Sequence, residues 1–375
     1  MSVDPVAQEI VIDKDVDNVL HSGALRERLQ DPSLGEGTIT LIIRDPNITI
    51  IGDMNIGRDD LEKAPLYGCK SLVRVDLKGC TKLTQLGDAV FMDCSSLTSV
   101  LLPDRLTRLD DGVFGGCSSL TSVVLPDGIT QLGDIVFGNC SSLTSVALPD
   151  GITKLGDGVF GGCSSLTSIA LPDGLTQLGD AVFVDCSSLT SVSLPDGLTQ
   201  LGDFVFSGCS SLTSVALPDG LTQLGGALFE ECSSLTSVAL PDGITLLGDD
   251  AFNGCSSLTS VTLPDGLTQL GVDVFNGCSS LTSAANSAGF VSVVPYLRDR
   301  YKCVTLRKLF LRLLGKYNQA VNEANGTEAE KNAIALAYFP KDNSSTLDVG
   351  LFLQTMNASG GNGIEGLVGY ILKFV

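Results

Sequence analysis

The chain has 375 residues and a formal net charge of −20, with 43 Asp and Glu against 23 Lys and Arg. A field of this sign disfavours nucleic acid and anionic membranes as partners, because contacts to phosphate supply most of that affinity. The sequence contains one histidine, His21, so the composition also argues against most hydrolases that depend on a histidine base.

Residues 1–38 are predicted to form an N-terminal cap. Within them, residues 17–29 space apolar side chains such as Val19 and Leu20 among polar ones, as a short amphipathic helix does. The first residues lack a basic segment followed by an apolar run, and no stretch of the chain reaches about 18 apolar residues. We therefore expect no signal peptide, no membrane insertion and an intracellular, cytoplasmic location.

Residues 39–283 are built from a repeated unit. A typical unit, residues 117–139, has the sequence CSSLTSVVLPDGITQLGDIVFGN. No unit this short can enclose its own apolar face, so an array of units folds only by stacking neighbours into a solenoid. The period is 23 residues, and it is marked by nine cysteines: Cys94, Cys117, Cys140, Cys163, Cys186, Cys209, Cys232, Cys255 and Cys278.

Each unit is predicted to place two short strands on one coil. Residues 122–125 alternate outward and inward side chains like a half-buried strand. Pro126-Asp127-Gly128 then has the composition of a tight corner, and residues 130–132 form the second strand. The apolar residues of the unit point inward and form the core.

The repeated pattern C-x-x-L-x-x-V-x-L-P-x-x-L/I-x-x-L-G-x-x-x-F-x-x resembles the BspA-like class of leucine-rich repeats. The Leu-Pro step, the Leu-Gly step and the Phe-x-x-Cys junction recur together in unit after unit, and degenerate copies extend the match toward residue 39. The resemblance implies an α/β solenoid, a curved array of short parallel strands used for contact with other macromolecules. It implies no catalytic residue and no cofactor.

The repeated thiols are expected to be reduced and buried. Consecutive coils would place them about 4.8 Å apart, which allows disulfides by distance, but parallel side-chain directions give poor bridge geometry. A cysteine beside the apolar Phe junction behaves as a small core residue. We expect at most Cys80 and Cys303 to react early with thiol reagents, and no zinc site, because ligands do not converge around His21.

Two columns of aspartates are expected on the surface. The first occupies the Pro-Asp-Gly corner: Asp104, Asp127, Asp150, Asp173, Asp196, Asp219, Asp242 and Asp265. The second follows the Leu-Gly step, with breaks at Gly226 and Val272: Asp88, Asp111, Asp134, Asp157, Asp180, Asp203 and Asp249.

The preferred interpretation of both columns is that each carboxylate caps its own turn and keeps the solenoid soluble. The alternative is weak calcium bridging between neighbouring coils along the Pro-Asp-Gly column, from Asp127 to Asp242. One carboxylate per coil supplies few of the roughly six to eight oxygens that calcium takes, so this affinity would be low.

A third column is the outward position of the main strand: Val124, Ala147, Ala170, Ser193, Ala216, Ala239 and Thr262. It is small and uncharged, and a column of serines from Ser99 to Ser260 runs beside it. One interpretation is that short side chains let the sheet curve. The other is that they form a mildly apolar strip that a partner can approach closely without desolvating charge.

Residues 284–375 change character, because the repeat ends and helical periodicity begins. Helices are predicted at about 303–324, 328–339, 346–358 and 364–375. This region is either a cap, which a solenoid needs over its exposed end coil, or a small separate domain.

Taken with the columns, these features favour a non-catalytic scaffold that binds a protein partner along the strand face. The acidic surface favours a basic or mildly apolar partner. The alternative function is a structural or adhesive assembly protein assisted by calcium along the corner aspartates.

Overall fold

The computed structural model describes residues 8–12, 19–20, 38–52, 64, 66–287 and 293. The chain divides into two compact units, Met1–Val294 and Pro295–Val375, and all the described residues lie in the first unit. The helices predicted between residues 303 and 375, together with Cys303, lie outside the described residues.

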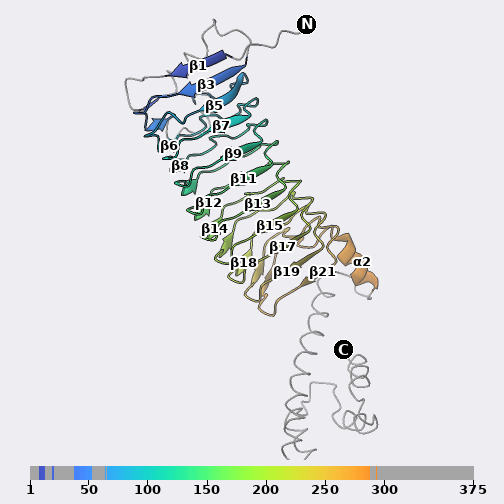
Figure 1. The fold of residues 1–375 in the computed structure, drawn as a ribbon. Coiled ribbons are helices and arrows are strands. Elements are labelled where there is room, and N and C mark those ends of the chain that lie inside the picture. The colour runs from blue at the N-terminus through green and yellow to red at the C-terminus, as the bar shows by residue number, and fades with distance from the viewer. Residues whose placement is uncertain are drawn as a thin grey trace, which may run out of the picture. The chain divides into compact units, whose positions relative to one another are not determined.

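The longer strand of each coil stacks in one row (Figure 1). Hydrogen bonding divides the row into sheets of β1-β3-β5-β7, β9-β11 and β13-β15-β17-β19-β21. The strands are β1 (Gln8–Ile12), β3 (Ile39–Ile43), β5 (Leu72–Asp76), β7 (Ser99–Leu101), β9 (Ser122–Val124), β11 (Ser145–Ala147), β13 (Ser168–Ala170), β15 (Ser191–Ser193), β17 (Ser214–Ala216), β19 (Ser237–Ala239) and β21 (Ser260–Thr262).

A second row holds the shorter strand of each coil. It divides into a sheet that runs from β2 to β16 and a sheet of β18-β20-β22. The strands are β2 (Val19–Leu20), β4 (Ile50–Ile51), β6 (Gln85–Leu86), β8 (Arg108–Leu109), β10 (Gln131–Leu132), β12 (Lys154–Leu155), β14 (Gln177–Leu178), β16 (Gln200–Leu201), β18 (Gln223–Leu224), β20 (Leu246–Leu247) and β22 (Gln269–Leu270).

Both rows are parallel, and between β9 and β22 the paired residues lie one sequence repeat apart. The N-terminal coils are less regular, and the register of β3 with β5 shifts between Ile39 and Thr40. Ser145 pairs with Ser122, Val146 with Val123 and Ala147 with Val124, each 23 residues apart. The centre of each three-residue strand is a buried Val or Ile, and its two neighbours in the strands from β9 to β21 are exposed. The period of two therefore fixes which side chains enter the core and which form the outer face.

A stack of phenylalanines forms the centre of the core. The rings of Phe91, Phe114, Phe137, Phe160, Phe183, Phe206, Phe229, Phe252 and Phe275 follow one another with centroids 5.4–5.7 Å apart and interplanar angles of 4–19°. These are offset-stacked distances, which favour aromatic pairs beyond the area that they bury. One Phe per unit thus continues through the whole array.

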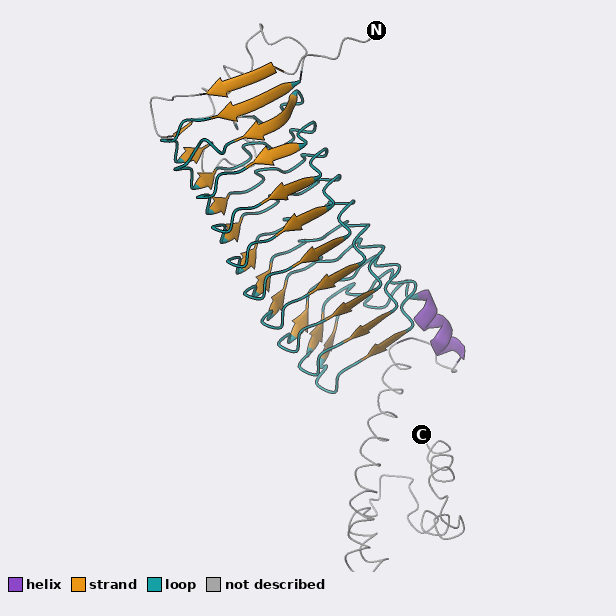
Figure 2. Ribbon diagram, viewed as in Figure 1, coloured by secondary structure: helices purple, strands orange, loops and turns teal. Residues whose placement is uncertain are grey.

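The remaining side of each coil is made of turns, as Figure 2 shows. Two positions per coil have positive φ, for example Ile135 (φ 57°) and Asn139 (φ 58°), and a helix cannot contain this left-handed conformation as a regular feature. The backbone N–H groups of this side donate to the following coil, as Phe137 N–H does to Val159 O at 2.9 Å. The described coils are therefore β coils, and the predicted α/β class is wrong for them.

The N-terminal segment adds strands to the solenoid. β1 pairs with β3 over five residues, and Val19 and Leu20 form β2, which pairs with β4. The helix predicted to contain Val19 and Leu20 is wrong at these two residues, because they pair in parallel with Ile50 and Ile51 and so extend the second row. The rest of the predicted helix lies outside the described residues.

The last unit departs from the repeat earlier than predicted. Helix α2 (Ser279–Ser287) begins directly after Cys278, within the range assigned to the solenoid. At the inward strand positions this unit has Ala284 and Asn286 where other units have Val and Leu. Alanine is the best helix former and buries little apolar surface, so a strand here would gain less than a helix does.

Candidate functional site

The outer face of the longer strands exposes the predicted column of small residues, which we call the strand-face strip: Val124, Ala147, Ala170, Ser193, Ala216, Ala239 and Thr262. Val124 is 80% exposed, although it is apolar. Register aligns the members directly, since Ser193 pairs with both Ala170 and Ala216. These residues therefore share one exposed face.

The serine column beside the strip is exposed and has no hydrogen-bond partner among the described residues. Ser122, Ser145, Ser168, Ser191, Ser214, Ser237 and Ser260 are exposed, and their hydroxyls make no hydrogen bond to any described residue. The threonines that precede them differ, because Thr144 Oγ1 donates to Thr121 O at 3.2 Å and Thr236 Oγ1 to Thr213 O at 3.2 Å. The serines are thus donors and acceptors available to a partner.

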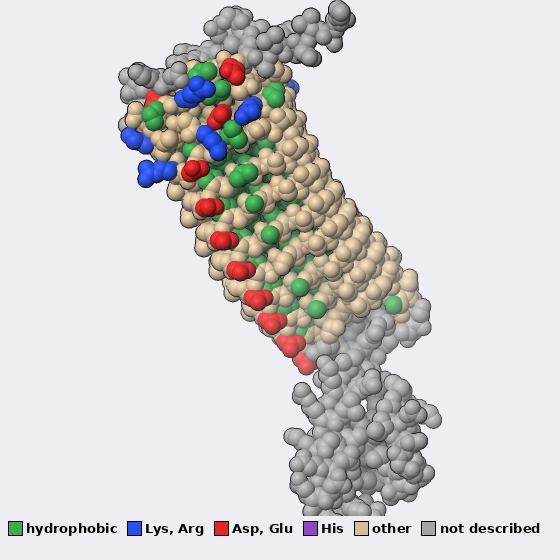
Figure 3. Space-filling model, in the orientation of Figure 1, with side chains coloured by type: hydrophobic (Ala, Val, Ile, Leu, Met, Phe, Trp, Pro, Cys, Tyr) green, Lys and Arg blue, Asp and Glu red, His purple; other side chains and the backbone are tan. Residues whose placement is uncertain are grey.

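The strip ends at its N-terminal side in charged residues. In β5, Arg74 pairs with Ser99 and Asp76 with Leu101, so charges replace the serine and the small residue. Lys and Arg side chains gather on the N-terminal coils (Figure 3). From residue 109 to residue 287 the sequence has one cation, Lys154. The neutral, acid-bordered part of the face is therefore confined to β9 through β21.

The corner aspartates lie exposed along the solenoid. Figure 3 shows acidic side chains in a line along one edge of the strand face. The corner that follows each longer strand lies at this edge. The carboxylates of Asp127, Asp173 and their equivalents make no hydrogen bond or ion pair with any described residue. The backbone closes each corner, as Ile129 N–H does by donating to Pro126 O at 3.1 Å. The predicted turn-capping role of this column is wrong.

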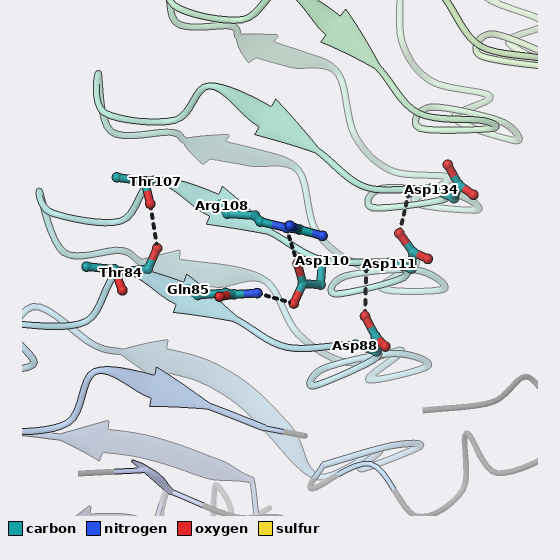
Figure 4. A network of polar contacts seen from close by, with 8 residues as sticks. All are labelled: Thr84, Gln85, Asp88, Thr107, Arg108, Asp110, Asp111 and Asp134. Carbon is teal, nitrogen blue, oxygen red and sulfur yellow. Dashed lines mark hydrogen bonds and ion pairs between the residues drawn. The ribbon is translucent and has the colours of Figure 1, made fainter. Parts of the chain in front are cut away.

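The second aspartate column connects coils. Each Oδ1 accepts the backbone N–H of the equivalent residue in the next coil, as Asp111 does from Asp134 at 2.8 Å (Figure 4). Asp134 accepts from Asp157 in the same way, also at 2.8 Å. Bonds of a backbone N–H to an ionised acceptor are stronger than neutral ones. The turn-capping prediction is therefore also wrong here, because these carboxylates bind the following coil and not their own turn.

A polar cluster that the sequence analysis did not single out lies beside this ladder. Asp110 is 3% exposed, Arg108 Nε forms an ion pair with its Oδ1 at 2.5 Å, and Gln85 Nε2 donates to its Oδ2 at 2.6 Å (Figure 4). Most units have glycine at this position, for example Gly133. The replacement of the Leu-Gly step by Leu109-Asp110 is therefore the sequence feature that could have indicated this cluster. The cluster joins two coils at the N-terminal, basic end of the array.

The repeated thiols are buried hydrogen-bond donors. Cys163 Sγ donates to Phe137 O at 3.1 Å, and the same bond recurs from Cys117 to Cys278. All the described cysteines are free. Burial raises the pKa of the Cys163 thiol to about 12, which makes it a poor nucleophile. Cys80 is also buried, and burial raises the pKa of its thiol to about 12, so the structure does not favour Cys80 as one of the few thiols expected to react early.

Within the described part of the chain, no three His, Cys, Asp or Glu side chains lie close enough to hold a metal ion. Nor does any helix among the described residues have the length and hydropathy to cross a membrane. Calcium bridging would have to use the corner carboxylates, which supply one group per coil.

The fold and surface define a parallel β-solenoid whose most accessible feature is an uncharged strand face. The model for the BspA type leucine-rich repeat region matches residues 60–190 and 176–293, in six copies. The chain belongs to the BspA-type leucine-rich repeat family. The resemblance noted from the sequence is confirmed.

Solved structures give similar proteins of the same repeat class. A leucine-rich repeat protein from Bacteroides ovatus is 26% identical, with 62% of this chain and 69% of that chain covered and a TM-score of 0.48. The T. pallidum leucine-rich repeat protein is 35% identical over 46% of this chain and 84% of its own, with a TM-score of 0.42. A leucine-rich cell surface protein from Faecalibacterium prausnitzii is 22% identical over 72% and 86%, with a TM-score of 0.40. A search of curated protein sequences finds no match.

Proposed function

We propose that this protein is a non-catalytic scaffold that binds a protein partner along the strand-face strip. The observation that carries the proposal is the run of exposed, small, uncharged side chains from Val124 to Thr262, held in register by parallel pairing. A partner can approach this backbone closely and bury area without paying to desolvate charge. Proteins built from this repeat commonly act as interaction or adhesion scaffolds, which supports the same function.

The border of the strip favours a partner with basic side chains. The corner aspartates have no partner among the residues that the structure describes, so Lys or Arg of a second protein could pair with them at the edge of the face. Such contacts at an exposed rim speed association and select partners more than they add affinity. The strip would then supply most of the binding energy, and the aspartates would determine which partner binds.

The proposal is tested by placing bulk and charge on the strip. A partner is first isolated from the native host with the array as bait, and its affinity is then measured by calorimetry. Ala170→Arg combined with Ala216→Glu leaves the inward Ile169 and Val215 unchanged, so the fold should persist while affinity falls by more than about 2 kcal/mol, roughly thirtyfold.

The matched control places the same charges on the second row. Gln200→Arg combined with Gln223→Glu changes two exposed residues of β16 and β18, and binding should be unaffected. Asp173→Asn with Asp219→Asn tests the corner instead. If these Asn changes abolish binding while the strip variant binds normally, contact is electrostatic and lies at the edge, and the proposed surface is wrong.

The calcium alternative has few ligands available. Each Oδ1 of the second column already accepts a backbone N–H, so of the two columns only the corner carboxylates have no hydrogen bond to a described residue, and they supply one group per coil. Calorimetric titration with Ca²⁺ separates the two functions, because saturable heats in the micromolar range would favour calcium-assisted assembly over a scaffold that needs no ion.

A further inference from the structure

Two Asn-Gly pairs in the last coils have the same sequence but different surroundings. Asn253-Gly254 and Asn276-Gly277 both lie within the sequence FNGCSSLTS. Asn-Gly is the dipeptide most prone to spontaneous deamidation, because glycine leaves its own backbone nitrogen unhindered. Since the neighbouring residues are identical, any difference in reactivity between the two pairs must come from the fold.

In the earlier pair, both groups that would react, the backbone nitrogen of Gly254 and the side-chain amide of Asn253, are hydrogen-bonded. Gly254 N–H donates to Asn276 O at 2.8 Å, as this position does to the following coil throughout the array. The side-chain amide of Asn253 donates to Asp250 Oδ1 at 3.1 Å. In addition, the carboxylate of Glu231 lies over Gly254, where an added Cβ would be 2.7 Å from it.

The later pair lacks each of these restraints. The described residues contain no further coil, and neither the Gly277 N–H nor the Asn276 side chain has a hydrogen bond to any of them. Asn276 and Gly277 are both exposed. The residue that stacks against Gly277 from the previous coil is Gly254, which has no side chain to cover it.

We propose that Asn276-Gly277 is a site of spontaneous deamidation and isomerisation, and that the fold protects Asn253-Gly254. The Gly277 nitrogen attacks Cγ of Asn276, the N–Cγ bond forms, and the Cγ–Nδ2 bond breaks as ammonia leaves with the backbone proton. Water then opens the resulting succinimide at either carbonyl, which gives aspartate or isoaspartate at residue 276. Water is the one reactant needed, and no oxidant takes part.

The position gives the modification a structural consequence. Residue 276 lies between Phe275, whose ring stacks on Phe252, and Cys278, whose thiol donates to Phe252 O at 3.1 Å. Isoaspartate lengthens the backbone by one bond between these two buried anchors. The last coil and the start of α2, at Ser279, should therefore loosen as the protein ages.

The test incubates the full chain under native conditions and follows both sites by mass spectrometry. A protease that cuts before aspartate releases residues 250–264 with Asn253 and residues 273–298 with Asn276, so each site has its own peptide. Aspartate at residue 276 creates a new cleavage site and isoaspartate does not, which separates the two products. Asn325-Gly326 and Asn362-Gly363 lie outside the described residues and fall in other peptides.

We expect Asn276 to react at least about fivefold faster than Asn253, since one lost backbone hydrogen bond of about 1 kcal/mol corresponds to that factor. In denatured chain the two rates should be equal. Asn276→Gln, whose longer side chain would need a six-membered ring, should stop the reaction at residue 276 and leave Asn253 unchanged. Equal native rates at the two sites, or no native reaction at Asn276 while the denatured chain reacts, would overturn the proposal.

Discussion

Each repeated cysteine adds a second hydrogen bond to a buried carbonyl. Phe137 O accepts the backbone N–H of Cys140 and the thiol of Cys163, both at 3.1 Å. A carbonyl oxygen has two lone pairs, so a small residue that is apolar and can also donate suits this position. The role of hydrogen-bond donor could not be seen in the sequence, because it depends on a carbonyl 26 residues away.

Thiol labelling tests this burial. In native protein the cysteines of the array should react slowly, and in denatured protein completely, because reaction requires an exposed thiolate. Among the described cysteines, Cys69 is the half-buried one and should react first. Mass spectrometry of labelled peptides at successive times gives the order. Rapid native labelling of Cys117 to Cys255 would contradict the structure.

The buried thiols also predict how stability depends on pH. Burial raises the pKa of Cys163 from its usual value of 9.0 to about 12, so between these values the native state keeps a proton that the unfolded state has lost. The contribution is complete below about pH 9 and is lost as the pH rises toward 12, at up to about 1.4 kcal/mol per pH unit for each thiol. Urea unfolding between pH 8 and about pH 10.5 should show this decline in the unfolding free energy, because that interval begins below the usual thiol pKa and ends below the raised one.

The control for this decline is Cys163→Ser. It should cost about 1–3 kcal/mol at neutral pH, because a shorter hydroxyl leaves space around Phe137 O. It should also reduce the slope above pH 9, since one titrating thiol is gone. An unchanged slope would mean that other groups, such as tyrosines and lysines, cause the alkaline loss.

The turn that returns each coil to the next cysteine alternates between two kinds of residue. Asp93, Asn139, Asp185 and Glu231 alternate with Gly116, Gly162, Gly208 and Gly254, and all have positive φ. The side chain of the first kind lies over the glycine of the next coil, so an added Cβ at Gly162 would be 2.4 Å from Asn139 Oδ1. At this turn the structural period is therefore two coils.

Alanine substitution at two glycines tests this packing. Gly162→Ala meets both the positive φ (73°) and the Asn139 side chain, and should destabilise by about 1–3 kcal/mol. Gly174→Ala, in a corner where the nearest atom is 3.7 Å away, should change stability by less than about 1 kcal/mol. Asn139→Gly should recover part of the first loss. Equal effects of the two alanine variants in thermal unfolding would contradict the alternation.

At this scale the sequence predicted the repeating elements and missed those at the ends. The two strands per coil, the inward residues and the exposed strip follow from a local period, which the 23-residue repeat restates many times. β2 and α2 were missed because each occurs once. The degenerate pattern at β2 is decided by pairing with Ile50 and Ile51, and α2 forms in a unit whose inward positions hold Ala284 and Asn286. The two aspartate columns differ in whether the carboxylate reaches a backbone N–H of the next coil. That difference depends on how coils stack, so it cannot be read from the sequence of one unit.

Along the array, both aspartate columns place negative charges on successive coils, but only one column forms hydrogen bonds between coils. The corner carboxylates face solvent without partners, and neighbours repel by about 0.8 kcal/mol at roughly 5 Å in water before screening. The second column has the same charge spacing, but each carboxylate accepts a backbone N–H of the next coil, as Asp157 does from Asp180 at 2.9 Å. The solenoid thus combines an unfavourable acidic column with a stabilising one.

Matched substitutions in the two columns should therefore have opposite effects. Asp173→Asn removes repulsion and should raise the unfolding free energy by up to about 1 kcal/mol at low salt, with the gain fading toward 1 M salt as the Debye length falls to about 3 Å. Asp157→Asn keeps an acceptor but replaces a charged bond by a neutral one, so it should cost about 0.5–1.5 kcal/mol at every salt concentration.

Urea unfolding of both variants across a salt series measures the difference. The wild-type protein should itself gain stability with salt, because screening reduces the repulsion along the corner column while the bonded carboxylates are affected less. If Asp173→Asn destabilises the protein as Asp157→Asn does, the corner carboxylate has a stabilising partner. The acidic edge would then be part of the fold, and fewer of its charges would be available to a basic partner.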